Sequence, residues 1–145
     1  MIHRRAEGAR PSRRAVLAGA ASAGVALPAL AGMGEARVTL TTTLGEIVVA
    51  ADTGRAPITA GDFLEYVDLG LFDDAAFYRT VRPDNDINPV KIEVIQGGVT
   101  AEKRFRPPIA HEPTNVTGLR HLDGTLSAGR NKPGSGSAGA FFICI

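Results

Sequence analysis

Residues 37–51 read RVTLTTTLGEIVVAA, with apolar and polar side chains alternating on both sides of Gly45. The apolar letters follow the pattern V-x-L before the glycine and I-x-V after it. A period of two is typical of half-buried β-strands, and a glycine between two such runs is typical of a turn. The segment therefore predicts a β-hairpin.

A helix is predicted directly after the hairpin, over residues 57–69. Pro57 suits the first turn of a helix, and Gly70 stands where the helix would end. Between them, apolar residues recur at helical spacing: Phe63, Leu64 and Val67. The order so far is a hairpin followed by a helix.

The rest of the chain consists of short apolar runs separated by turn residues, which predicts strands joined by loops. The predicted strands cover residues 77–81, 92–95, 124–128 and 140–145. A polar loop is expected over 83–89, and a ligand-facing connection rich in Gly, Ser and Asn over 129–139. This order favours an antiparallel barrel with a helix at one end.

Composition excludes several classes of protein. The chain has 145 residues, 44% of them hydrophobic, which predicts one soluble globular domain. It has 16 basic and 15 acidic residues, so nothing indicates a nucleic-acid partner. The single cysteine, Cys144, cannot form an internal disulfide, and its apolar neighbours predict an inert strand residue.

No cofactor or metal is predicted. The acidic and histidine pairs have neither zinc-site nor calcium-loop spacing, so we interpret them as solvated loop residues. They are His111 with Glu112, His121 with Asp123, and the acidic residues of 84–86.

The first 31 residues are predicted to be a signal peptide. Arg13-Arg14 precede an apolar stretch rich in Ala and Gly, and residues 29–31 read A-L-A, a cleavage pattern. The adjacent arginines favour the twin-arginine route. At about 16 residues the apolar stretch is shorter than the roughly 20 that a membrane span needs, although an uncleaved anchor is the alternative. We therefore expect a mature chain that begins near Gly32, is periplasmic or secreted, and is not held in the membrane.

Several motifs of the mature part, taken in order, resemble the cyclophilins, a family of peptidyl-prolyl cis/trans isomerases. They are Gly45-x-Ile47, Ala56-Pro57-Ile58-Thr59-Ala60, Phe77-Tyr78-Arg79, Gln96-Gly97-Gly98 and Phe141-Phe142-Ile143. Each motif alone is weak, but their common order is hard to obtain by chance. The resemblance covers residues 37–145.

The resemblance implies a mainly β fold: an eight-stranded antiparallel barrel capped by helices, with a peptide groove on one outer face. Cyclophilins continue past the Phe-Phe-Ile motif through a further loop, a helix and a closing strand. We therefore expect that the domain at 37–145 is incomplete at its C-terminus and that its closing elements are missing from this chain.

The family likeness also implies a site for an X-Pro peptide. Arg79 occupies the position of the catalytic arginine, whose guanidinium donates to the prolyl nitrogen as the amide twists. Simple alternation places Phe77 on the same face as Arg79, although the family uses that position for core packing. The implied substrate-binding residues are Tyr78, which replaces the usual histidine, Gln96, Phe142 as the floor of the proline pocket, and the main chain of Gly129 and Arg130.

Some positions depart from the family pattern. The link between Arg79 and Gln96 is longer than usual, Glu93 and Val94 stand where pocket residues are expected, and Ala140 replaces a glutamine that contacts peptide. Three functions stay open: an isomerase acting on exported proteins, a proline-peptide-binding or chaperone-like module with little catalysis, and an unrelated secreted barrel. The expected partners are proline-containing segments of unfolded chains, and we expect a monomer.

Overall fold

The computed structural model describes residues 2–3 and 34–145, the first two by their backbone alone. Apart from those two residues, the predicted signal peptide at 1–31 lies outside the described part, as does the expected mature start at Gly32. In residues 2–3 and 34–145, no helix is long and apolar enough to cross a membrane.

The predicted hairpin is confirmed. Strands β2 (Glu35–Thr42) and β3 (Gly45–Asp52) pair antiparallel, and β1 (Ile2–His3) pairs with β2 to complete a three-stranded sheet. At the turn, the Thr42 hydroxyl donates to the Gly45 carbonyl at 2.8 Å and accepts the N–H of Leu44 at 3.1 Å. Gly45 has a φ of 133°, which only glycine adopts at low cost.

The predicted helix is confirmed as α1 (Pro57–Asp68), which ends one residue earlier than expected. Gly70 has a φ of 63°, and the N–H groups of Leu69 and Gly70 bond to carbonyls of the last turn, as expected of a glycine stop. The buried face of the helix carries Ala60, Asp62, Phe63, Tyr66 and Val67.

A second sheet contains the remaining strands, in the order β4-β5-β8-β6, with β7 also paired to β8. The bounds are β4 Ala76–Val81, β5 Val94–Gly98, β6 Ile109–Ala110, β7 Leu126–Gly129 and β8 Ser135–Cys144. Two short helical turns, η1 (Glu102–Arg104) and α2 (Thr114–Thr117), lie between strands. The mainly β antiparallel fold is therefore confirmed, while the strand pairing of the described residues does not close into a barrel.

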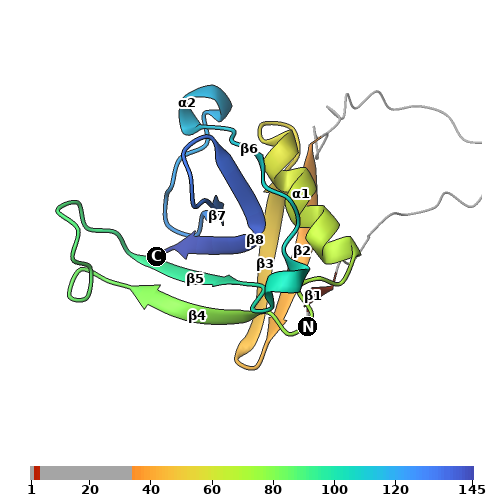
Figure 1. Ribbon diagram of the computed structural model, residues 1–145, viewed down its shortest axis with the longest axis horizontal. Helices are drawn as coiled ribbons and strands as arrows, with labels where there is room; N and C mark the ends of the chain where they lie inside the picture. The colour runs from red at the N-terminus through yellow and green to blue at the C-terminus, as the bar shows by residue number, and fades with distance from the viewer. Residues whose placement is uncertain (1, 4–33) are drawn as a thin grey trace, which may run out of the picture.

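An aromatic cluster joins the two sheets to α1. Phe72 lies at the centre, with ring centroids 5.4 Å from Phe63, 5.2 Å from Tyr66 and 5.7 Å from Phe141. The same core includes buried side chains from the hairpin: Val38, Leu40, Val49 and Ala51. Figure 1 shows α1 lying along β2 and β3, with β4 and β5 extending away from the body of the molecule.

Several strand boundaries differ from the sequence-based expectation, most of all in β5 and β8. β5 begins at Val94 and not at 92, and β8 begins at Ser135, inside the expected 129–139 loop. The small residues of this segment allow close packing: Ala138 is buried, and a Cβ on Gly139 would lie 2.6 Å from the Tyr66 hydroxyl. Its glycines therefore serve close packing against α1 as much as they serve a turn.

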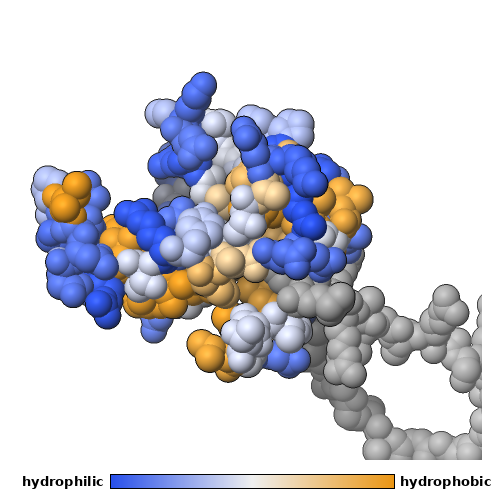
Figure 2. Space-filling view, turned by 60° about the horizontal axis from the view of Figure 1, so that its bottom comes forward, coloured by the Kyte–Doolittle hydropathy of each residue, from blue (hydrophilic) through white to orange (hydrophobic). Residues whose placement is uncertain are grey.

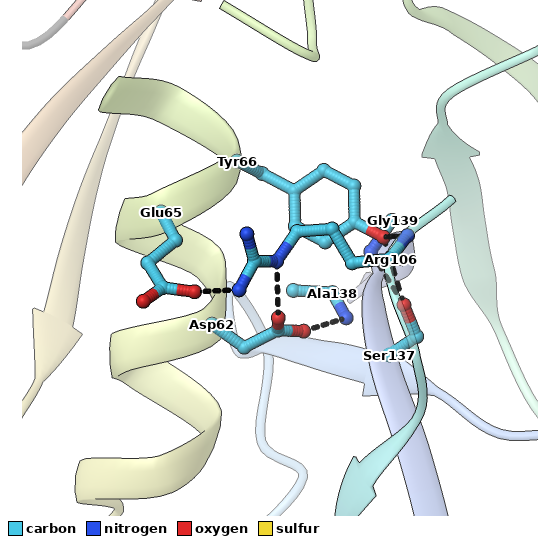
Figure 3. Close-up of polar contacts among 7 residues, drawn as sticks. All are labelled: Asp62, Glu65, Tyr66, Arg106, Ser137, Ala138 and Gly139. Carbon is cyan, nitrogen blue, oxygen red and sulfur yellow. Dashed lines mark hydrogen bonds and ion pairs between the residues drawn. The ribbon is translucent and has the colours of Figure 1, made fainter. Parts of the chain in front are cut away.

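A polar network fastens α1 to the segment before β6 and to β8 (Figure 3). The Arg106 guanidinium forms ion pairs with Asp62, at 3.3 Å, and with Glu65. The backbone N–H of Arg106 donates to the Tyr66 hydroxyl at 2.6 Å, and that hydroxyl lies 3.2 Å from the Ser137 hydroxyl. Helix, loop and strand are thus cross-linked through side chains that the sequence places far apart.

Glu112 caps α1 from outside the helix. The residue at the N-cap position, Ala56, makes no side-chain capping bond. Instead, the Glu112 carboxylate accepts the N–H groups of Ile58 at 3.1 Å and Thr59 at 2.7 Å. Burial raises the pKa of Glu112, but the bonds from Thr59 and Ile58 outweigh it, so the pKa lies below its ordinary value of 4.5. The charged form is the one that stabilises the helix start.

Replacing Glu112 by Gln is expected to lower the free energy of unfolding by about 1 kcal/mol at pH 7, the usual size of a lost helix cap. A carboxyl whose pKa is lowered on folding contributes stability above its unfolded pKa, and this is lost as pH falls through the folded pKa. The difference from wild type is therefore expected to shrink below pH 4.5. Urea unfolding at several pH values measures it.

The matched control is Glu46→Gln, at an exposed position of β3, which is expected to change stability by less than about 0.5 kcal/mol. An equal loss in both variants, or a Glu112→Gln loss that stays constant down to pH 3, would contradict the capping role.

Candidate functional site

A β-bulge in β4 separates Phe77 from Arg79. Phe77 pairs with Gly97 and Arg79 with Gln96, so the register shifts at Tyr78. Since successive residues of β5 point to opposite faces, Phe77 and Arg79 lie on opposite faces as well. The expectation from simple alternation, that they share a face, is wrong.

Phe77 occupies the core side of this sheet. Its ring meets the buried Phe141 edge-on at a centroid distance of 5.9 Å, yet 38% of the residue stays exposed. The ring contact confirms the expected packing role of Phe77, although the residue is not fully buried. The bulge therefore turns Arg79 toward the outer face of the sheet, while Phe77 stays on the face that packs against the core.

Four side chains form a row across the outer face, one from each neighbouring strand. Arg79 of β4 is paired with Gln96 of β5, Gln96 with Phe142 of β8, and Phe142 with Ser127 of β7. Paired residues share a face, and strands lie about 4.8 Å apart, so the row is about 14 Å long. The structure thus brings together Arg79, Gln96 and Phe142, three of the residues predicted from sequence.

Gln96 orients Arg79. The Arg79 Nη1 donates to the Gln96 Oε1 at 3.3 Å, and Arg79 is otherwise exposed. One N–H of the guanidinium is engaged in this bond, while a guanidinium carries five. In the described part of the chain the other N–H groups of Arg79 have no hydrogen-bond partner, and the residue is exposed, so they are available to a bound molecule.

His121 extends the row beyond Phe142. Its ring centroid lies 5.6 Å from that of Phe142 with the planes tilted by 32°, and its Nε2 is 3.1 Å from the Ser127 hydroxyl. The interpretation of His121 as a solvated loop residue was therefore incomplete. No local sequence signal identifies this contact, because it depends on the pairing of β7 with β8 and on the turn that returns residues 121–125 to the sheet.

The other predicted site residues lie around the row. Tyr78 is the bulged residue, 49% exposed, and in the described part of the chain no hydrogen bond or ring contact links it to the row. Gly129 ends β7, where the register with β8 shifts. The side chain of Arg130 lies 3.2 Å from the Nδ1 of His111, away from Arg79.

The positions that depart from the family pattern leave the row with few polar groups on one side. Ala140 pairs with Gly98, two residues from Phe142 on the same strand face, and its methyl group offers no hydrogen bond. Val94 is buried and pairs with Cys144, while Glu93 is exposed just before β5. Neither of the last two supplies an accessible pocket wall beside Phe142.

Cys144 is half-buried in β8, as expected of a strand residue. Burial, and then the charge of Asp123, raise the pKa of its thiol, so the thiolate needed for reactivity is disfavoured. Across residues 2–3 and 34–145, no three His, Cys, Asp or Glu side chains are grouped so as to hold a metal ion.

A large cavity lies apart from the Arg79 end of the row. It has a volume of about 970 Å³ and lies between β3, α1, β7 and β8. Core residues such as Phe63 and Phe141 line it, as do His121, Ser127 and Phe142 at its edge. Arg79 and Gln96 are not among its walls, so the row runs from the edge of this cavity, at Ser127 and Phe142, to an exposed surface at Arg79.

The chain is similar to members of one known protein family. The family model described as "Cyclophilin type peptidyl-prolyl cis-trans isomerase/CLD" matches residues 37–145. The chain is 32% identical over 122 residues to peptidyl-prolyl cis-trans isomerase A of Dickeya dadantii, covering 81% of the chain and 58% of the relative. It is 30% identical over 112 residues to peptidyl-prolyl cis-trans isomerase B of Escherichia coli, covering 74% and 62%. The chain therefore spans about three fifths of the length of these relatives.

The bulge that presents Arg79 depends on the absence of a side chain at Gly97. A Cβ there would lie 2.9 Å from the Phe77 ring and 3.1 Å from the Ala76 carbonyl oxygen. Gly97→Ala is therefore expected to lower the free energy of unfolding by about 1–3 kcal/mol through overpacking. Chemical denaturation measures the change.

Gly61 provides the control, because a Cβ there would meet nothing within 4 Å and the residue lies inside α1. Gly61→Ala is expected to raise stability by up to about 1 kcal/mol. If Gly97→Ala were as stable as wild type, the close packing of β4 on β5 would not be needed to hold the bulge.

Proposed function

The chain belongs to the cyclophilin-type peptidyl-prolyl cis-trans isomerase family, and we propose that it accelerates the cis/trans isomerisation of X-Pro bonds. The observation that carries the proposal is the row on the outer face, where an oriented cation, Arg79, and an apolar ring, Phe142, lie on the two sides of Gln96. A twisted prolyl amide is stabilised by a hydrogen-bond donor at its nitrogen and by an apolar surface that holds its ring.

The chemistry follows from the resonance of the amide. Rotation about an X-Pro bond crosses a barrier of about 18–20 kcal/mol because the nitrogen lone pair is delocalised into the carbonyl. In the twisted state the lone pair returns to the nitrogen, which becomes a hydrogen-bond acceptor. A donor that meets it only in this state stabilises the transition state more than the ground state, and this difference is what accelerates a reaction.

Arg79 is suited to be that donor. A guanidinium stays protonated at all relevant pH values and presents its N–H groups in a fixed plane. The bond from Nη1 to Gln96 limits the rotation of this plane and leaves further donors free to meet substrate. The Phe142 ring, flanked by His121, then receives the pyrrolidine ring, and the main chain of Gly129 and Arg130 pairs with the peptide backbone.

A binding module is the second candidate, and Ala140 is the observation that favours it. Its side chain cannot hydrogen-bond a peptide, and the buried Val94 adds no wall to the proline seat. Such a site would hold proline-containing segments through Phe142 and the strand backbone while giving little acceleration. The two candidates share a ligand and differ in whether the rate of isomerisation rises.

The substrates that we propose are exported proteins in the course of folding. Uncatalysed X-Pro isomerisation takes tens to hundreds of seconds and can limit folding. The support for this setting is the pair Arg13-Arg14 ahead of a short apolar stretch and the A-L-A pattern at 29–31.

Export predicts a mature N-terminus near Gly32 in material recovered from the periplasm of a bacterial host. Edman sequencing or intact mass measurement identifies that terminus. Replacing Arg13 and Arg14 by Lys is expected to block export if the twin-arginine route is used. Recovery of the chain with Met1 intact in the membrane fraction would contradict cleavage.

Arg79→Ala is expected to lower kcat/KM for a short proline peptide at least tenfold, which equals about 1.4 kcal/mol or more of transition-state stabilisation. Arg79→Lys is expected to be nearly as damaging, because an ammonium lacks the planar set of donors. Peptide affinity and the circular dichroism spectrum are expected to stay close to those of wild type. A protease-coupled assay gives the rate.

Arg82→Ala is the matched control, since Arg82 is exposed and pairs with Asp84 on the loop that follows β4. Its rate is expected to equal that of wild type within twofold. If wild type binds the peptide without accelerating it, or if Arg79→Ala is as fast as wild type, the binding module takes the place of the enzyme.

A further inference from the structure

The connection between β4 and β5, residues 82–93, projects from the molecule next to the Arg79 row. Two paired antiparallel strands are usually joined by two to five residues, whereas this connection has twelve. Figure 1 shows it as a loop that continues beyond the ends of β4 and β5, away from the body of the molecule. Because these two strands also carry Arg79 and Gln96, the loop is a direct extension of the site.

The first turn of this loop is fixed by hydrogen bonds. The Asn85 side-chain oxygen accepts the Arg82 N–H at 2.8 Å, and the Asp86 N–H donates to the Arg82 carbonyl at 2.9 Å. The Asn85 side-chain nitrogen also donates to the carbonyl of Thr80, the residue after Arg79, at 3.2 Å. The loop is therefore tied to the strand that presents the arginine.

Asp86 closes the rest of the loop. It is 7% exposed, its Oδ1 accepts both the backbone and the side-chain N–H of Asn88 at 3.0 and 2.7 Å, and its Oδ2 accepts the Ile92 N–H at 3.0 Å. The bond from the Asn88 backbone is the main cause of a lowered pKa for Asp86, which partial burial opposes. One carboxylate thus links both sides of the loop and holds its shape.

The shape presents apolar side chains to solvent. Ile87 is 97% exposed and Val90 79%, and Ile92 is about half exposed. Figure 2 shows a hydrophobic patch at the outer end of the projecting loop, set among hydrophilic atoms. Ile87 and Val90 add nothing to the core, because both lie at the outer end of the loop that Asp86 holds in shape. They are available for contact with another molecule.

The size and charge of this surface indicate what it contacts. Two or three aliphatic side chains provide only a small part of the roughly 800 Å² per partner of a standard protein interface. Residues 82–93 hold two basic and three acidic side chains, so no strong charge selects an ionic partner. A weak, neutral, apolar contact next to a peptide site suits an unfolded chain that is already held at the proline, since a second contact then acts at high effective concentration.

We propose that the β4–β5 loop is a second contact site, which binds apolar side chains of an unfolded polypeptide while its proline occupies the Arg79–Phe142 row. The inference rests on the proposed function and adds a second contact surface for the same substrates, because the loop favours protein chains over short peptides. A four-residue peptide spans at most about 14 Å, the length of the row itself, while a chain of ten or more residues reaches about 33 Å.

The test compares an Ile87→Ser/Val90→Ser double variant with Leu44→Ser. Leu44 is 98% exposed at the turn of the β2–β3 hairpin, so the control removes an equally exposed aliphatic group elsewhere. Each variant of the full chain is assayed with a four-residue proline peptide and with a reduced, alkylated protein whose refolding is limited by X-Pro isomerisation. Circular dichroism confirms that each variant is folded.

For the double variant, kcat/KM is expected to stay within twofold of wild type on the peptide and to fall at least fivefold on the protein, through KM. Asp86→Ala keeps Ile87 and Val90 but removes the carboxylate that holds the loop. Its kcat/KM on the protein is expected to fall by a smaller factor than that of the double variant. Leu44→Ser is expected to leave kcat/KM unchanged for both substrates. Equal effects on both substrates, or no effect on the protein, would overturn the inference.

Direct binding separates this inference from the proposed function. Fluorescence anisotropy of a labelled, permanently unfolded protein gives its Kd without any need for catalysis. If neither wild type nor any variant accelerates isomerisation, the proposed function fails, while a Kd at least fivefold weaker in the double variant but unchanged in Leu44→Ser still supports the loop contact. Unchanged binding, or a wild-type dimer that the double variant abolishes in sedimentation, would show that the loop does not contact unfolded chains.

Discussion

The buried carboxylate of Asp62 is the interaction on which the arrangement of this domain depends. From the middle of α1 it accepts the backbone N–H of Ala138 at 2.9 Å and pairs with the Arg106 guanidinium at 3.3 Å. Its side chain is 2% exposed, so removal of the arginine would leave an uncompensated charge, at a cost on the order of 3–5 kcal/mol. Helix, loop and strand can therefore take only the arrangement that satisfies this group.

Strand β8 links the Asp62 contact to the row of residues on the outer face, because it contains both Ala138 and Phe142. Ala138 lies in the first half of the strand, and four residues later Phe142 faces outward, while Phe141 faces the core. β8 pairs with β5, β6 and β7, so its register decides which side chains of those strands stand beside Phe142. A shift of one residue would send Phe142 inward and break the row from Arg79 to Ser127. The polar contact at Asp62 and the apolar contacts of Phe141 favour the same register.

Local patterns predicted the elements well, and they predicted the site only in part. The hairpin around Gly45 and the helix that ends before Gly70 follow from periodicity and stop signals, and both are confirmed. Contacts between distant residues were not predictable from the same patterns. The bulge at Tyr78, the cap that Glu112 supplies to α1 and the ring contact of His121 with Phe142 all require partners set by strand pairing. Small residues at 135–139 were read as a loop because their packing partner, Tyr66, lies some 70 residues away in the chain.

The two faces of the second sheet divide core packing from the proposed site. The inner face holds Phe141 and Gly97 against the core, where volume is tightly constrained. The outer face holds Arg79 and Gln96, which are joined by one 3.3 Å hydrogen bond and contribute little to packing. Substitutions at those two positions are therefore expected to test the proposed catalysis without unfolding the protein. Phe142 belongs to the outer face, but its ring also contacts the tilted His121 ring at the edge of the large cavity, so the proposed substrate contact and local packing share this side chain. The bulge at Tyr78 turns Arg79 outward, while the ring of Phe77 in the same strand packs on the core. The geometry of the proposed site therefore depends on backbone pairing more than on the choice of side chains in the row.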